Sequence, residues 1–301
     1  MKLEHVVSAI SEQAKKIIAV AHAEDEEVIL SVKEAYNLGL ASFRLYGDEQ
    51  AIQRLLHKHE LQRSHELEVF PTDAAHASLE AVKAVHFGDA HILMKGHVPT
   101  ATLMKAVLNK EYGLRTGNVL SHVAVFEVPG YDRLLFITDS GMNIAPDVTQ
   151  KAQIIENAAA VARGMGVPLP KVAVLAAVET LNPAMSATTD ASLLTTMNRR
   201  GQLQGCIVDG PLALDNAINL HAAKMKHIDG EVAGRADILM VPSIEVGNVL
   251  YKSLVYFAHA KNGGMIAGAK APIVLTSRSD SAQSKLYSIA LAITSLQNES
   301  E

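Results

Sequence analysis

The residues best suited to chemistry lie near the C-terminal end, where an apolar run breaks into a polar turn. Residues 273–275 predict a short buried strand, and Thr276-Ser277-Arg278-Ser279-Asp280-Ser281 follows it directly. Apolar side chains then recur with the spacing of one helix face from Leu286 to Leu296. A guanidinium beside a helix N-terminus favours an anion, because free N–H groups and the helix dipole add to its charge. The turn therefore predicts a site for a phosphate or a thiolate.

A simpler interpretation of the same turn stays open. Asp280 or Ser281 would cap the following helix, and Asp280 with Gln283 three residues later fits a capping box. Caps of this kind are common, and Arg278 would then be an ordinary surface charge.

Composition and charge exclude several classes of protein. The chain has 301 residues and a net charge of −5, so no global basic field would recruit nucleic acid. No segment approaches the ~20 apolar residues that span a bilayer, and the charged N-terminal residues do not fit a signal peptide. The single cysteine, Cys206, excludes an internal disulfide framework and predicts a buried structural residue. Together these features predict a cytoplasmic protein.

Strand and helix patterns alternate along the chain, which predicts an α/β fold with parallel strands covered by helices on both faces. The turn Pro129-Gly130-Tyr131-Asp132 predicts a hairpin between strands at 123–128 and 134–138. The other predicted strands are 17–20, 42–46, 68–70, 92–94, 172–178, 207–209 and 238–241, and the predicted helices are 26–38, 50–57, 74–85, 151–165, 191–200 and 247–260. Asn262-Gly263-Gly264 is expected to end the helix at 247–260.

The chain is predicted to form two α/β lobes. The first comprises residues 1–138 and 266–301, and the second comprises residues 139–265. Polar turns directly follow several strands: Asp139-Ser140-Gly141, Asp209-Gly210, Pro242-Ser243-Ile244-Glu245 and Thr276-Ser277-Arg278. Ligands of open α/β sheets bind beyond the carboxyl ends of strands, so these turns are candidate site segments.

Several common motifs fail. Gly263 and Gly268 have the gap of a phosphate loop, but Ala269-Lys270 follows in place of Lys and Ser/Thr. No G-x-G-x-x-G, G-x-S-x-G or H-E-x-x-H pattern supports a dinucleotide, a serine nucleophile or a zinc site. His57, His59 and His65 lie in a charged stretch, where we expect solvated side chains and no metal.

Four blocks within about fifty residues carry a resemblance to a known family. They are residues 229–237, residues 241–252, residues 264–272 and the Ser277-Arg278 turn. Together they resemble the phosphate acyltransferases, which interconvert acyl-CoA and acyl phosphate. Within that family, the chain resembles the phosphate butyryltransferases more than the phosphate acetyltransferases. The points of likeness are its short length and residues 93–96, 106–110, 113–117 and 275–281.

This resemblance implies an α/β/α fold like that of isocitrate and isopropylmalate dehydrogenases, with two lobes and the active site in the cleft between them. It implies the reaction butyryl-CoA plus phosphate giving butyryl phosphate plus CoA, and its reverse. Coenzyme A would be a substrate, with no tightly bound cofactor and no metal. Acyl-CoA, phosphate and acyl phosphate would be the partners of a homo-oligomer.

The resemblance also implies roles for particular residues. Ser277 and Arg278 match the family's catalytic Ser-Arg pair. Further substrate-binding candidates are Arg115, Lys95, Asp280, Ser281, Glu245, Asn248 and Lys252. A simpler interpretation is that Arg115 and Lys95 are ordinary surface cations. Likewise, Ser243 or Asn248 could simply cap the helix predicted at 247–260. Acetyl-transferring relatives have an aspartate seven residues after the serine, whereas this chain has Ser284 there.

Three alternatives stay open. The preferred acyl group could be acetyl, or a branched group such as isobutyryl or isovaleryl, because one methylene changes selectivity only ~10–200-fold. A non-catalytic CoA-binding protein on the same scaffold would explain the missing acid at Ser284. A dehydrogenase on the related fold has no support from a metal-binding aspartate cluster or a dinucleotide loop.

Overall fold

The computed structural model describes residues 2–10, 15–275 and 280–297, and it divides into two compact units. Unit 1 comprises Met1–Leu3 and Val119–Asn262, and unit 2 comprises Glu4–Asn118 and Gly263–Glu301. The chain thus leaves unit 2 for unit 1 and returns near residue 263. The lobe boundaries expected from the sequence stay a prediction.

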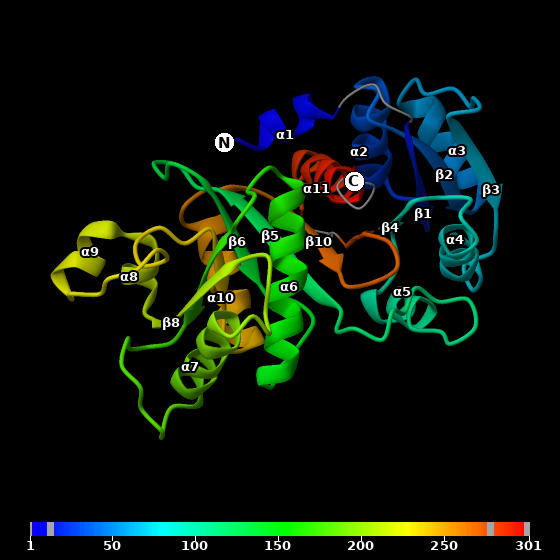
Figure 1. Cartoon of the computed structure of the whole chain (residues 1–301). Coiled ribbons are helices and arrows are strands. Elements are labelled where there is room, and N and C mark those ends of the chain that lie inside the picture. The colour runs from blue at the N-terminus through cyan, green and yellow to red at the C-terminus, as the bar shows by residue number, and fades with distance from the viewer. Residues whose placement is uncertain (1, 11–14, 276–279, 298–301) are drawn as a thin grey trace. The chain divides into compact units, whose positions relative to one another are not determined.

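Unit 2 is built on a mostly parallel sheet in the order β3-β2-β1-β4-β11-β10, coloured blue and cyan with orange β10 in Figure 1. Only β10 and β11 pair antiparallel, through Ile266 and Ile273. Its elements, of which α1 and β10 begin in unit 1, are α1 (Leu3–Ala9), β1 (Lys16–Ala21), α2 (Glu26–Asn37), β2 (Ala41–Gly47), α3 (Glu49–Lys58), β3 (Leu67–Pro71), α4 (Ala77–His86), β4 (Ile92–Lys95), α5 (Thr100–Val107), β10 (Lys261–Ala267), β11 (Ile273–Val274) and α11 (Ala282–Gln297).

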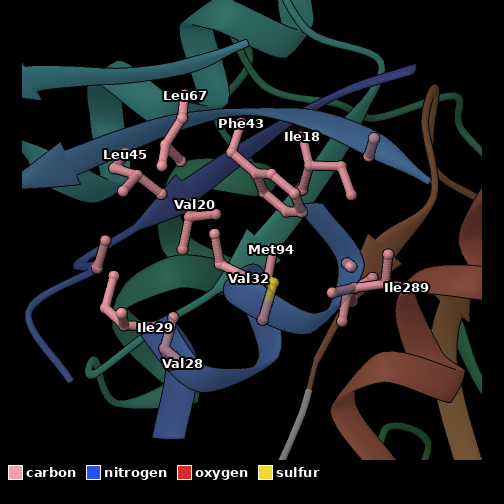
Figure 2. Packing of buried hydrophobic residues seen from close by; sticks show 14 of the residues in the cluster. Ile18, Val20, Val28, Ile29, Val32, Phe43, Leu45, Leu67, Met94 and Ile289 are labelled. Atoms are coloured by element: carbon pink, nitrogen blue, oxygen red, sulfur yellow. The ribbon is translucent and has the colours of Figure 1, made fainter. Parts of the chain in front are cut away.

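A hydrophobic core fills one face of this sheet, as Figure 2 shows. Ile18, Phe43 and Met94 project from the strands toward side chains of α2 and α11, including Val32 and Ile289. Helix α11 packs beside α2, so the last helix of the chain covers the same face as the first long one. Helix α4 contacts β1 without joining this cluster, so it lies on the other face.

Unit 1 repeats the layered plan with the strand order β5-β6-β9-β7-β8. Strands β5 and β6 form the predicted antiparallel hairpin, and the remaining neighbours are parallel. Helix α10 packs on one face of the sheet, and α6 and α7 contact strands from the other. Its elements are β5 (Ser121–Glu127), β6 (Leu134–Thr138), α6 (Val148–Gly164), β7 (Lys171–Leu175), α7 (Ser186–Arg199), β8 (Ile207–Leu212), α8 (Leu214–Ile218), α9 (Leu220–Met225), β9 (Ile238–Met240) and α10 (Ile244–Tyr256).

The predicted end of the helix at 247–260 is wrong. Helix α10 ends at Tyr256, and residues 262–264 do not end it but belong to strand β10. A Cβ on Gly263 would lie 3.0 Å from atoms of Tyr287 and Ser288, so the glycine lets the strand approach α11. The N–H of Gly264 donates to the Ser288 hydroxyl at 2.9 Å. The two glycines therefore allow β10 to pack against α11. The sequence pattern had predicted that they end the preceding helix.

A buried ion pair joins α6 to α7 in unit 1. Lys151 Nζ lies 2.5 Å from Asp190 Oδ2, and the lysine side chain is 5% exposed. We predict that Asp190→Asn lowers the free energy of unfolding by about 3–5 kcal/mol, because it leaves a buried ammonium without its counter-charge. Urea denaturation measures this. Glu80→Gln, in the exposed pair with Lys83, is the matched control and should cost less than about 1 kcal/mol. Equal losses in the two variants would contradict the assignment.

Candidate active site

The parallel strands of unit 2 end at a common edge. Strand β4 pairs in parallel with both β1 and β11, and Val274 of β11 lies opposite Met94. The carboxyl ends of β1, β4 and β11 therefore lie side by side. Ser277 and Arg278 follow β11 in the sequence but lie outside the described residues, so their catalytic roles stay predictions.

Lys95, the last residue of β4, is buried, which removes the alternative of an ordinary surface cation. Its ammonium donates to the carbonyl of Gly96 at 3.1 Å and to that of Val98 at 3.3 Å. These bonds hold the loop that follows β4. Whether Lys95 also contacts substrate stays a prediction.

Arg115 lies exposed in the segment between α5 and β5. Its two neighbours are tied to the turn before β11: the Thr116 hydroxyl donates to Gly268 O at 2.7 Å, and Lys270 N–H donates to Leu114 O at 2.8 Å. The guanidinium is thus carried by a backbone that is fixed at both sides. Such anchoring suits a cation that must meet an anion at a defined place.

Ser281 is the N-cap residue of α11, as one of the two predicted alternatives has it. Its hydroxyl accepts from Ser284 N–H at 3.1 Å, and the two hydroxyl oxygens also lie 3.1 Å apart. The Gln283 amide donates to the Tyr287 hydroxyl at 3.0 Å. Asp280 lies partly buried just before the cap.

Lys285 is a buried cation beside this cap that the sequence pattern did not indicate. Its ammonium donates to the Asp280 carbonyl at 2.6 Å, and its side chain is almost fully buried. Lysine is rarely buried in this way unless its charge has a partner. Lys285 is not one of the apolar positions that predicted the helix, and its burial depends on contacts outside the helix, such as the one with the Asp280 carbonyl.

In unit 1, the polar turn after β6 is organised by a buried carboxylate. Asp139 accepts from the N–H groups of Gly141 and Met142 at 2.8 and 2.9 Å. It also accepts from the N–H and the side-chain amide of Asn143 at 3.2 and 2.6 Å. These four bonds satisfy the carboxylate and fix the turn that carries Ser140.

His122 meets this turn from the neighbouring strand. Strand β5 runs antiparallel to β6, so the start of β5 lies beside the end of β6. The Thr138 hydroxyl donates to the His122 carbonyl at 2.9 Å, and His122 Nδ1 lies 2.8 Å from Ser140 Oγ. A hydroxyl and an imidazole are therefore hydrogen-bonded at a sheet edge where ligands commonly bind.

The three predicted residues of α10 lie exposed within the first nine residues of that helix. The Asn248 amide donates to Ser140 O at 3.5 Å, so Asn248 is brought to the turn that carries Ser140. Hydrogen bonds from the Ser243 hydroxyl and from the backbone N–H of Glu245 itself hold the pKa of the Glu245 carboxyl below its ordinary value. Ser243 occupies the N-cap position but makes no side-chain capping bond, and Lys252 lies exposed one turn beyond Asn248.

The first turn of α10 packs directly on the segment that holds Asp139 and Ser140. A Cβ on Gly247 would lie 2.6 Å from Asp139 O and 2.9 Å from Ser140 Cα, so only glycine fits there. Of the predicted site residues, Glu245, Asn248 and Lys252 thus belong to unit 1. Lys95, Arg115, Asp280 and Ser281 belong to unit 2.

Three further findings bear on sequence-based expectations. Cys206 is buried, and burial raises the pKa of its thiol to about 11, which fits a structural residue. Among residues 2–10, 15–275 and 280–297, no group of three or more His, Cys, Asp or Glu side chains could hold a metal ion. Within the same ranges, no helix combines the length and apolar character that crossing a bilayer requires.

Known proteins match this chain over most of its length. A family model described as "Phosphate acetyl/butaryl transferase" matches residues 62–293. A probable phosphate butyryltransferase of Bacillus subtilis (strain 168) is 55% identical over 97% of both chains. This chain belongs to the phosphate acetyl/butyryl transferase family. The sequence-based assignment to the phosphate acyltransferases is confirmed.

Other members of the family are also similar to this chain. A phosphate acetyltransferase of Thermotoga maritima is 45% identical over 97% of this chain and 99% of its own length. The crystal structure of a branched-chain phosphotransacylase from Enterococcus faecalis V583 is 38% identical, with a TM-score of 0.82 over 93% of this chain and 99% of that one. The names of family members thus cover acetyl, butyryl and branched-chain substrates.

The predicted dehydrogenase-like fold is confirmed. A 4-hydroxythreonine-4-phosphate dehydrogenase from Klebsiella pneumoniae superposes with a TM-score of 0.58 over 93% of this chain and 100% of that chain. At 14% identity this likeness concerns the fold alone. The phosphate acyltransferase family therefore shares its architecture with dehydrogenases, as the resemblance implied.

One carboxylate in unit 1 gives a test of the electrostatics. Burial raises the pKa of Asp209, so folding disfavours its ionised form at neutral pH. We predict that Asp209→Asn increases the free energy of unfolding at pH 7 and that this gain disappears below the ordinary aspartate pKa, where the wild-type residue is protonated. Asp132→Asn should have the opposite sign at pH 7, because the Arg133 hydrogen bond lowers the pKa of Asp132. Urea melts at both pH values check the signs, and a gain that persists at low pH would refute this account.

Proposed function

We propose that this chain transfers an acyl group between coenzyme A and inorganic phosphate, with butyryl-CoA as the preferred thioester. The observation that carries this proposal is the near full-length identity of 55% to a probable phosphate butyryltransferase. The Ser277-Arg278 pair after β11 supports it, since the family's chemistry needs a cation and a donor at the reacting carbonyl.

The chemical problem is that two polyanions must meet at one carbonyl carbon. Arg278 binds phosphate or the acyl phosphate, because guanidinium pairs bidentately with such oxygens. Ser277 donates to the oxygen that becomes negative as the carbonyl is attacked. Arg115, Lys95, Asp280, Ser281, Glu245, Asn248 and Lys252 complete the proposed set of substrate-binding residues.

The described geometry refines several of these proposed roles. Lys95 acts through the loop that its ammonium holds after β4. Ser281 acts through the cap that starts α11, and Asp280 through the backbone carbonyl that Lys285 binds. Arg115 is the exposed cation of the set in unit 2, and it suits the phosphate groups of coenzyme A.

The identity of the preferred acyl group is a separate part of the proposal. Acetyl-CoA is the alternative substrate, and the acetyl-transferring relative at 45% identity supports it. Branched acyl groups are equally compatible with the relatives' names. A non-catalytic CoA-binding role is the alternative from another class, and Ser284 in place of the family's acid favours it.

Assembly with identical chains and a cytoplasmic location also belong to this proposal. Val249 and Tyr256 of helix α10 are more than half exposed, and Phe257, directly after the helix, is 86% exposed. Apolar side chains gathered on one exposed helix surface favour burial against a partner, and a second copy of the chain is the partner we propose.

Release of free CoA thiol tests the reaction directly. We predict fast release from butyryl-CoA or isobutyryl-CoA only when phosphate is present, because phosphate is the acyl acceptor. Acetyl-CoA should react more slowly by roughly 10- to 200-fold in kcat/KM, as expected for a pocket that gains contacts from added methylenes. Faster reaction of acetyl-CoA would favour the acetyltransferase alternative. Absence of phosphate-dependent release from folded protein would favour the binding role.

Replacement of Arg278 tests the anion site. We predict that Arg278→Ala reduces kcat/KM for phosphate at least 100-fold, since a transition-state contact worth several kcal/mol is lost. Arg278→Lys should restore only part of the rate, because lysine lacks the planar fork of donors. Arg235→Ala, which replaces an exposed arginine of unit 1, serves as the control and should keep the wild-type rate. Activity of Arg278→Ala within twofold of wild type would remove Arg278 from the site.

A further inference from the structure

Lys285, in the first turn of α11, carries a positive charge that the described part of the chain does not neutralise. Only 2% of the residue is exposed. Within residues 2–10, 15–275 and 280–297 it forms no ion pair, and its ammonium donates only to the main-chain carbonyl of Asp280, at 2.6 Å. Taking an ammonium out of water is costly, and one neutral carbonyl offsets only part of that cost. An anion beside this ammonium would therefore be strongly favoured.

The position of Lys285 within α11 makes its charge less favourable still. The helix begins at Ala282, and the N–H of Lys285 makes the first bond of the helix, to Ser281 O at 3.0 Å. The helix dipole favours anions near the N-terminus and cations near the C-terminus. Burial also reduces the screening of such interactions by salt and water. A lysine that served stability alone would be better placed in the last turn of the helix.

The same end of α11 also presents main-chain hydrogen-bond donors. The first N–H groups of a helix have no partner inside it, and those of Ala282 and Gln283 have no acceptor among the described residues. Helical side chains point toward the N-terminus, and the Lys285 ammonium accordingly reaches the Asp280 carbonyl just before the helix begins. An ammonium and main-chain N–H groups are thus gathered at one helix end, which is an arrangement that suits an oxyanion.

This end of α11 lies toward the carboxyl ends of the parallel strands of unit 2. Strand β10 runs antiparallel to β11, so Gly264 lies toward the carboxyl end of β11, and its N–H donates to the Ser288 hydroxyl of α11 at 2.9 Å. Farther along the helix, Ile289 and Ile293 lie in the hydrophobic core of the same sheet. Ligands of open α/β sheets bind beyond the carboxyl ends of strands. All of these groups belong to unit 2.

We propose that Lys285 binds the phosphate substrate at the N-terminus of α11. This inference rests on the proposed function and names a further residue of its phosphate site. The ammonium has three donors, so it keeps its bond to the Asp280 carbonyl and directs the others to the anion. Phosphate suits the site because its oxygens accept charge-assisted bonds from lysine and bonds from main-chain N–H groups together. The buried charge is thereby neutralised when the substrate binds.

Lys285→Gln tests the proposal, because glutamine removes the charge but keeps an N–H donor for the Asp280 carbonyl. Inorganic phosphate should raise the urea midpoint of the wild-type protein, since a ligand of the folded state stabilises it. Lys285→Gln should bind phosphate roughly 10- to 100-fold more weakly, as expected for the loss of one charged hydrogen bond, and lose most of that rise. Lys105→Gln, at an exposed position of α5 in the same unit, is the matched control and should keep the full rise. The general salt effect of phosphate is common to all variants.

A second measurement compares the two substrates. The KM for phosphate should rise roughly 10- to 100-fold in Lys285→Gln, whereas the KM for butyryl-CoA should stay within about twofold of wild type. Lys285→Arg keeps the charge and should recover most of the phosphate affinity. Lys285→Met fills similar space without a charge, and it decides the matter if Lys285→Gln does not fold.

Three results would overturn the role of Lys285. They are a wild-type midpoint that does not respond to phosphate, an equal response in wild type and Lys285→Gln, and a loss of stability in Lys285→Gln that is the same with and without phosphate. Wild-type protein that responds to phosphate but releases no CoA thiol from any acyl-CoA would instead overturn the proposed function. The anion site at α11 would then stand without it.

Discussion

The parallel register of the strands is the constraint on which the rest of the structure depends. In unit 2, β1, β4 and β11 run in parallel, so their carboxyl ends lie at one edge. In unit 1, the same holds for β6, β9 and β7. Helices bury both faces of such sheets, and a buried polar group without a partner is costly. Polar side chains that could bind a ligand are therefore expected at the carboxyl ends of the strands, where Lys95 and the turn with Asp139 lie.

The local sequence pattern was enough to predict most helices and strands. It failed where packing against distant parts of the chain determines the secondary structure. The apolar runs and the turn at Pro129 to Asp132 predicted the strands and the hairpin, because each signal lies within one short segment. Gly263 and Gly264 looked like a helix stop, yet they lie in β10 because α11 approaches the strand there. Helix α5 went unpredicted, since its eight residues give too few turns for a clear period.

Site residues could likewise be predicted where they depend on local sequence, but not where they depend on long-range contacts. The cap at Ser281 depends on residues three positions apart, so sequence could offer it as one of two alternatives. The contact of His122 with Ser140 joins residues 18 positions apart, and it exists only because β5 pairs antiparallel with β6. No motif encodes that pairing. The buried position of Lys285 likewise depends on contacts that the helix alone does not specify.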